Sequence, residues 1–175
     1  DTIEKTRYLL TDAINRQLVT DVEMCFFLSG GLDSSIICKT ASQYYKKNNL
    51  GVINTYSVEY EDNRKYFTKN AFQPNADFDY ISIMVDDTSS NHTEIVLNNK
   101  KVMEALYDSV KARDLPGYVD IDSSLLLFCK EVKKDYTVAL SGECADELFG
   151  GYPWYHNKNI LFEECFPWSR SQEIR

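Results

Sequence analysis

A short apolar run at residues 24–28 leads directly into a glycine-rich turn, and this junction limits the fold more than any other feature. The run reads Met-Cys-Phe-Phe-Leu, and it is followed by Ser29, Gly30, Gly31, Leu32, Asp33, Ser34 and Ser35. Such a sequence is typical of a strand, a tight turn and a helix start. Glycines let the backbone approach a ligand closely, and we expect Ser34 and Ser35 to cap the helix. Because a helix N-terminus favours negative charge, the turn predicts a phosphate site.

The turn differs from the usual P-loop. That motif ends in Gly-Lys-Ser/Thr, with the lysine on the β/γ-phosphates, whereas the first lysine after Gly31 is Lys39. Instead Asp33 stands inside the turn, and an acid beside phosphates is repulsive unless a divalent cation lies between them. The sequence therefore predicts a clamp for Mg²⁺ and pyrophosphate. Taken alone, the same residues also fit a simple Gly-Gly turn with a helix cap.

A second motif, at residues 141–151, reads Ser-Gly-Glu-Cys-Ala-Asp-Glu-Leu-Phe-Gly-Gly. Ser141 and Gly142 form another strand end where the backbone can approach a nucleotide. We expect Glu143 and Asp146 on one face of an opening helical turn, with Asp146 joining Asp33 at a metal and Glu143 free for general acid–base chemistry. Acids in a first helical turn can also simply complement the helix dipole, and we prefer this interpretation for Glu147.

The remaining sequence alternates strands and helices. We expect helices over residues 2–19, 34–46, 77–87, 100–113 and from Asp120 or Asp122 to 134, strands over 24–28, 52–58, 92–97 and 137–140, and an exposed loop over 59–77. This alternation predicts an α/β fold, a doubly wound parallel sheet of four to five strands with helices on both faces. In such sheets ligands bind beyond the carboxyl ends of the strands. The loops after strands one, two and four should therefore share one crevice.

Apolar spacing predicts which faces of the helices are buried. The inward positions are Ile3, Leu9, Leu10, Ala13, Ile14 and Leu18 in the first helix, Val102, Leu106 and Val110 in the fourth, and Ile121, Leu125, Phe128 and Val132 in the fifth. We expect the first helix to pack on the sheet.

Composition limits the class of protein. With 175 residues, of which 43% are hydrophobic, the chain can bury one sizeable core. A net charge of -8 argues against nucleic acid as a partner, and no apolar run is long enough to span a membrane. The five cysteines lack CxxC spacing, which predicts free, mostly buried thiols in a reducing cytoplasm. Two histidines leave little basis for a histidine metal site or a Ser-His-Asp triad.

Together the two motifs resemble a known enzyme family. Residues 29–35 resemble the pyrophosphate loop of the N-type ATP pyrophosphatases, the PP-loop superfamily of HUP-type, adenine nucleotide alpha-hydrolase-like folds. Residues 141–152 are similar to the Ser-Gly-Glu-x-Ala-Asp-Glu-Leu-Phe-Gly-Gly-Tyr signature of glutamine-dependent asparagine synthetases. The resemblance covers about residues 2–155, the front of the family's synthetase domain. We therefore expect a domain core over residues 1–155 and the start of a truncated helical region over 156–175.

The resemblance implies a magnesium-dependent ligase that uses ATP. The side-chain carboxylate of aspartate attacks the α-phosphorus of ATP to give β-aspartyl-AMP and pyrophosphate, and ammonia then displaces AMP to give asparagine. By matching position, residues 29–35 hold pyrophosphate and both Asp33 and Asp146 contact the metal. Glu143 takes a proton from the attacking ammonia. The positions that match adenosine contacts are Leu28, Val58, Ser141 and Gly142.

Departures from the family pattern leave alternatives open. The family's glutaminase half begins with a cysteine, but this chain begins with Asp1 and has no cysteine before Cys25. We therefore expect a fragment that lacks the ammonia source and is inactive or weakly active alone. Cys144 replaces a commoner glycine, which we expect a helix to tolerate, and residues 116–120 lack an arginine that many relatives carry. A β-lactam synthetase-like enzyme and a non-catalytic ATP-binding module remain alternatives, and a homodimer is left open.

Overall fold

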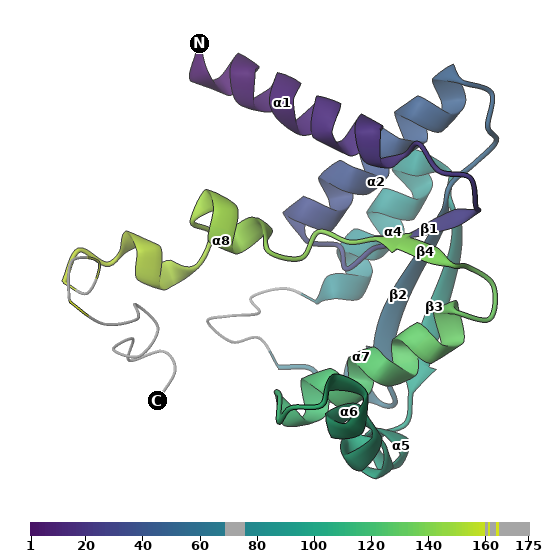
Figure 1. Ribbon diagram of the computed structural model, residues 1–175, viewed down its shortest axis with the longest axis vertical. Coiled ribbons are helices and arrows are strands. Elements are labelled where there is room, and N and C mark those ends of the chain that lie inside the picture. Colours follow the sequence, from purple (N-terminus) through teal and green to yellow (C-terminus); the bar gives the residue numbers. More distant parts are fainter. Residues whose placement is uncertain (69–75, 160, 162–163, 165–175) are drawn as a thin grey trace. The chain divides into compact units, whose positions relative to one another are not determined.

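The computed structural model describes residues 1–68, 76–159, 161 and 164. The chain divides into two compact units, Asp1–Ser141 and Gly142–Arg175 (Figure 1). The helices of the first unit are α1 (Thr2–Gln17), α2 (Leu32–Lys47), α3 (Asn63–Tyr66), α4 (Asp77–Thr88), α5 (Asn99–Glu104), α6 (Leu106–Arg113) and α7 (Val119–Val132). Its strands are β1 (Met24–Phe27), β2 (Asn54–Tyr60), β3 (Asn91–Leu97) and β4 (Val138–Leu140). The second unit contains α8 (Ala145–Phe149) and the 3₁₀ helix η1 (Pro153–His156).

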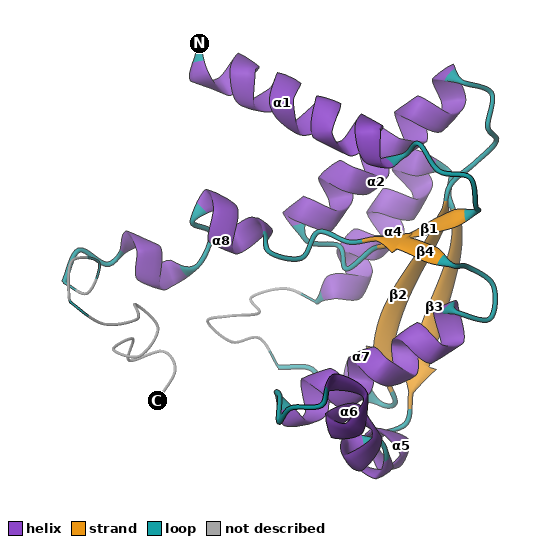
Figure 2. Ribbon diagram, in the orientation of Figure 1, coloured by secondary structure: helices purple, strands orange, loops and turns teal. Residues whose placement is uncertain are grey.

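The four strands form one parallel sheet in the order β3-β2-β1-β4 (Figure 2). Phe26 of β1 pairs with Thr55 of β2 on one side and with Leu140 of β4 on the other. The predicted doubly wound parallel sheet is confirmed. The chain adds β2 and β3 on one side of β1 and then returns to place β4 on the other, so the strand order reverses between β1 and β4. A reversal of this kind is where ligands of open α/β sheets bind.

Alternating side chains of β1 divide the core into two layers. Met24, Phe26 and Leu28 face α1, α2 and α4, where they pack with Ile14 and Ile81 among others. Cys25 and Phe27 face the opposite layer, in which Phe128 and Val132 of α7 pack against Tyr56. Because successive side chains of a strand point to opposite faces, the four residues of β1 and the Leu28 that follows them supply both cores. Helices therefore cover both faces of the sheet, as expected (Figure 2).

The first helix forms as predicted, but only its C-terminal half is buried. Ile14 joins the core, whereas Ile3 and Leu9 are 67% and 52% exposed. Contacts of α1 run mainly to α2, and Ile14 and Leu18 join the core with Met24 and Phe26 of β1, so the predicted packing on the sheet is confirmed for the C-terminal half of the helix only. No helix in the described part of the chain is long and apolar enough to cross a membrane.

The second strand is displaced from its predicted position. It begins at Asn54 rather than at residue 52 and continues to Tyr60, because β3 pairs with it over its full length. The strand end and α3 therefore occupy the start of the segment predicted as a loop at 59–77, and residues 69–75 of that segment lie outside the described residues.

The helix predicted over residues 100–113 is two helices that meet at Ala105. Asn98 caps α5 by accepting hydrogen bonds from the backbone N–H groups of Lys100 and Lys101. The break allows both α5 and α6 to pack against α7. Val110 is 44% exposed, so the single inward face predicted for this segment is wrong.

The start of α7 also differs from the prediction. Tyr118 is the N-cap, and Asp122 lies inside the helix, where its carboxylate accepts a 2.6 Å hydrogen bond from the Tyr118 N–H and pairs with Arg113. Neither Asp120 nor Asp122 is therefore the cap residue. This inward carboxylate sets the rotation of the helix, which buries Phe128 but leaves Ile121 and Leu125 58% and 50% exposed.

Cysteine burial is only partly as predicted. Cys25 and Cys38 are buried, and burial raises the pKa of these thiols to about 11 and about 12. Cys129 and Cys144 are exposed. All four are free thiols, as expected, and Cys165 lies outside the described residues.

Candidate functional site

The turn after β1 requires a glycine at position 30. Leu28 is 1% exposed, and its N–H donates a 2.8 Å hydrogen bond to the carbonyl of Tyr56. The chain then turns at Gly30 with φ of +79°, and a Cβ there would lie 2.8 Å from the Asp77 carbonyl oxygen and 2.9 Å from the Cβ of Tyr80. Left-handed backbone and close packing both exclude a larger residue. The first turn of α4 therefore presses directly on this loop, a contact for which the sequence carries no signal.

Two serine hydroxyls hold the turn against the first turn of α2. Ser34 is buried, and its Oγ accepts a 3.2 Å hydrogen bond from the Ser29 N–H and lies 3.0 Å from the Ser29 Oγ. The N-cap of α2 is Gly31, without a side-chain capping bond, so the prediction that Ser34 and Ser35 cap the helix is wrong. Instead Ser34 bonds backward to the Gly31 carbonyl, and the Ser35 N–H donates to the same oxygen.

The N-terminus of α2 presents the electrostatics of an anion site. The first N–H groups of a helix have no partner within the helix, and the dipole of a 16-residue helix adds partial positive charge at this end. Leu32 is 74% exposed and Asp33, in the same turn, is partly buried. A carboxylate among such amides can share an oxygen-bound divalent cation with a phosphate.

Residues of two neighbouring strands border this turn. Val58 of β2 lies two positions beyond Tyr56, which pairs with the last residue of β1, and its side chain is 40% exposed. On the other side of β1, Leu140 ends β4, so Ser141 continues from the carboxyl end of the adjacent strand. The first unit thus gathers residues 28–35, Val58 and Ser141 at one edge of the sheet.

The second unit carries the other predicted residues. Gly142 and Glu143 precede α8, and Asp146 lies in its first turn. Because α8 begins at Ala145, Glu143 stands in the turn before the helix, and the predicted helical face shared by Glu143 and Asp146 is wrong. Cys144 is the N-cap with φ of +69°, so it is not on a helix but in a conformation that suits glycine.

Gly151 packs tightly against Asp146. A Cβ at Gly151 would lie 1.9 Å from the Asp146 Oδ1, and the Gly151 N–H donates a 3.0 Å hydrogen bond to the Asp146 carbonyl. Gly150, the C-cap, has φ of +69°, so α8 ends at the glycine pair. Beside it, the Tyr152 hydroxyl donates to Glu147, and burial together with that carboxylate raises the pKa of Tyr152.

A metal site in the described part of this chain would use only one or two protein side chains as ligands. Within residues 1–68, 76–159, 161 and 164, no three His, Cys, Asp or Glu side chains come together as a metal-binding group. Carboxylates that bind Mg²⁺ with a nucleotide need not number three, because one or two commonly act with substrate phosphates and water. Asp33 and Asp146 match this donor chemistry.

Comparisons with known proteins indicate one family. The family model for asparagine synthase matches residues 5–175. The chain is 50% identical over its whole length to asparagine synthetase (glutamine-hydrolyzing) 3 of Bacillus subtilis strain 168, of which it covers 28%. Over 87% of the chain it is 31% identical to asparagine synthetase 1 of the same organism, covering 22% of that protein. The human asparagine synthetase is 26% identical over 86% of the chain, which covers 26% of it. The chain thus spans between 22% and 28% of the length of these relatives.

Proposed function

The chain belongs to the asparagine synthase family, and from this premise we propose that it carries the ATP-using site of asparagine synthesis. In the reaction a side-chain carboxylate oxygen of aspartate bonds to the α-phosphorus of ATP, and pyrophosphate leaves. The nitrogen of ammonia then bonds to the activated acyl carbon, and AMP leaves. We further propose that a glutaminase part supplies the ammonia and that the protein works in the cytoplasm.

The observation that carries this proposal is the turn between β1 and α2. Its position beside the reversal of strand order, its left-handed Gly30 and the exposed first turn of α2 suit a pyrophosphate group. In the proposed complex residues 29–35 hold the β- and γ-phosphates. Leu28, Val58, Ser141 and Gly142 contact the adenosine. Their contribution is to position the α-phosphorus for in-line attack, which is the main requirement of phosphoryl and nucleotidyl transfer.

Asp33 and Asp146 are proposed to hold Mg²⁺ through carboxylate oxygens. Bound there, the ion would neutralise charge on the triphosphate and on the leaving pyrophosphate. Glu143 is proposed as the base that removes a proton from the attacking ammonia. It is exposed and precedes α8, so its carboxylate can reach a substrate without a change in the helix.

The proposal is tested by titrating Mg²⁺–ATP into the chain by calorimetry. We expect Asp33→Ala to weaken Mg²⁺-dependent binding by about tenfold or more, because the lost metal contact outweighs the relief of repulsion between the carboxylate and the phosphates. Asp108→Ala is the matched control, since Asp108 is likewise an acid in a first helical turn, that of α6. The Mg²⁺–ATP affinity of this variant should equal that of the wild type.

The same variants decide the assignment of the reaction. This assay uses a longer protein that also contains the parts of the relatives that this chain does not cover. The wild-type form should release pyrophosphate from ATP only when aspartate is added, and the Asp33→Ala form should release none. If a folded wild-type chain binds no ATP, or if both variants behave alike, the proposed phosphate clamp is wrong. Pyrophosphate release without aspartate would reject aspartate as the acceptor.

A further inference from the structure

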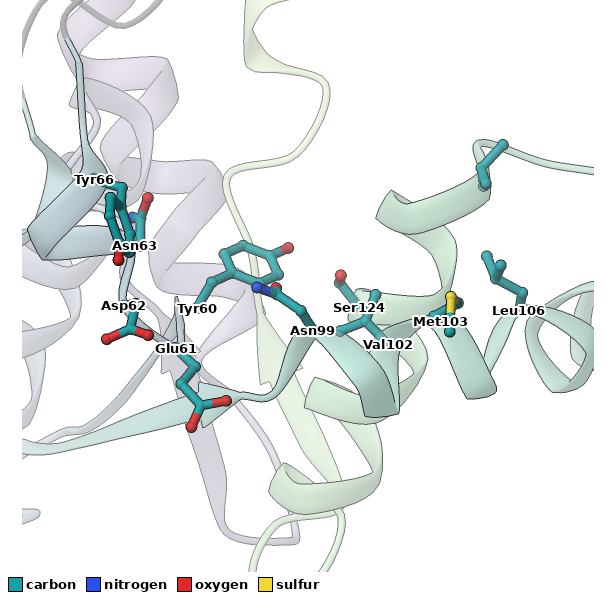
Figure 3. A pocket seen from close by; sticks show the side chains of 11 residues that line it. Tyr60, Glu61, Asp62, Asn63, Tyr66, Asn99, Val102, Met103, Leu106 and Ser124 are labelled. Atoms are coloured by element: carbon teal, nitrogen blue, oxygen red, sulfur yellow. The ribbon is translucent and has the colours of Figure 1, made fainter.

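A cavity of about 550 Å³ lies beyond the carboxyl ends of β2 and β3, within the first unit. One wall comes from the end of β2 and α3, and the other from α5, α6 and the start of α7 (Figure 3). Its volume is in the range of small-molecule sites, about 300–1,000 Å³. The residues that line it are Tyr60, Glu61, Asp62, Asn63, Tyr66, Asn99, Val102, Met103, Leu106, Val119 and Ser124.

Ser124 gives this cavity an unsatisfied polar group. The residue is 5% exposed, and its hydroxyl has no hydrogen-bond partner in the described part of the chain. Figure 3 shows the hydroxyl on the side of α7 that faces Tyr60 and Asn99. A buried hydroxyl without a partner is unfavourable, and a ligand with a hydrogen-bonding group would relieve that cost.

The lining separates into an apolar wall and an electronegative wall. Val102, Met103 and Leu106 form the apolar side, while the opposite side carries the acids Glu61 and Asp62 and the ring of Tyr66. The Glu61 carboxylate also accepts a hydrogen bond from the Asn98 side chain, which leaves Asp62 as the acid for a ligand. None of the described residues that line the cavity is Lys, Arg or His. The site therefore disfavours anions, including nucleotides and dicarboxylates, and favours a positive charge.

We propose that this cavity binds a small organic ammonium compound with an apolar body. The ammonium group lies between the carboxylate of Asp62 and the ring of Tyr66, and the apolar body lies against Val102, Met103 and Leu106. The Ser124 hydroxyl completes the site as a hydrogen-bonding group. Carboxylate attraction and a cation–π contact are the usual means of holding such a cation.

The chain itself shows that the Tyr66 ring attracts an ammonium group. Lys65, which is exposed, places its Nζ 4.9 Å from the centre of that ring. This lysine competes with a ligand for the same negative potential, and its removal should strengthen binding. A gain of affinity on loss of a surface lysine is not expected from a purely structural role.

The test uses phenethylamine as the probe and the full 175-residue chain. Calorimetry should give a dissociation constant near or below about 1 mM, and changes in backbone amide NMR signals should cluster at the residues that line the cavity. The anion 3-phenylpropionate has a similar apolar body and should not bind. It separates attraction of the ammonium group from unspecific apolar binding.

Three charge variants make the test specific. Asp62→Asn should weaken phenethylamine binding about three- to fivefold, and Lys65→Gln should strengthen it about two- to threefold, as expected for partly exposed charges. Asp21→Asn, an exposed acid before β1 and thus at the amino end of the sheet, is the matched control and should change nothing. The proposal is overturned if the amine does not bind, if the anion binds equally well, if Asp62→Asn and Lys65→Gln have no effect, or if the NMR changes lie elsewhere.

Discussion

At the scale of single residues, Gly30 of the candidate site has no room for a side chain, because the atoms nearest to an added Cβ belong to the first turn of α4. Gly30→Ala would add left-handed strain of about 1–2 kcal/mol and a clash with the first turn of α4, worth about 1–3 kcal/mol. We expect a total loss of about 2–5 kcal/mol in the free energy of unfolding, measured by urea denaturation.

The matched control for this substitution is Gly51→Ala. Gly51 has φ of +87°, but no atom lies within 4 Å of the position that a Cβ would take there. Gly51→Ala should therefore add only the strain, about 1–2 kcal/mol. Equal losses at the two glycines would show that the contact between Gly30 and α4 contributes nothing.

At the scale of elements, the half-buried ring of His92 joins β3 to β2. Its two nitrogens lie 3.0 Å from the hydroxyl oxygens of Thr55 and Ser57, both of which are buried. Burial lowers the pKa of His92 from its ordinary value of 6.5, although the charge of Glu94 opposes this. Arg64 and Asp86 line the same small cavity.

The sign of the pH dependence follows from the lowered pKa. Above about pH 6.5 the ring is neutral in both the folded and the unfolded chain, so His92 makes its full contribution to the free energy of unfolding. As the pH falls below that value the unfolded chain takes up the proton first, and the stability decreases until the folded pKa is passed. Urea denaturation between pH 8 and pH 5 should show this loss, and His92→Gln should flatten it.

The other histidine provides the control for that measurement. His156→Gln replaces the exposed histidine of η1 and should leave the slope unchanged. If His92→Gln retains the full slope, then other groups cause the pH dependence.

How far the elements could be predicted depended on whether local or distant contacts fix them. The strand-turn-helix at residues 24–47 and the parallel sheet follow from local apolar runs and glycines, and both were correct. The rotation of α7 could not be predicted, because it depends on the pairing of Asp122 with Arg113, nine residues earlier. The shift of β2 depends in the same way on pairing with β3, about 37 residues later in the chain.

Only part of the candidate site could be predicted from the sequence. Sequence motifs predicted the turn at residues 29–35 and a helix start near the acids that follow β4, because paired glycines after an apolar run favour a turn. The binding roles of these residues stay predictions. The motifs did not reveal that Cys144 adopts a left-handed conformation or that α4 packs on Gly30, since both result from the path of the folded backbone.

At the scale of the whole molecule, the proposed metal site uses two acids that lie far apart in the sequence, Asp33 and Asp146. If one Mg²⁺ ion binds both carboxylates together with ATP, removal of either one disrupts the same site, and removal of the second then costs little more. Residues that share one interaction show coupling energies of about 0.5–3 kcal/mol in double-mutant cycles.

The cycle is measured as Mg²⁺–ATP affinity for wild type, Asp33→Ala, Asp146→Ala and the double variant. We expect the double variant to bind only slightly more weakly than the weaker single variant. A parallel cycle of Asp33→Ala with Glu147→Ala should be additive, because Glu147 neighbours Asp146 in the first turn of α8 but is engaged by the Tyr152 hydroxyl. Strict additivity in the first cycle would mean that the two carboxylates do not share an ion.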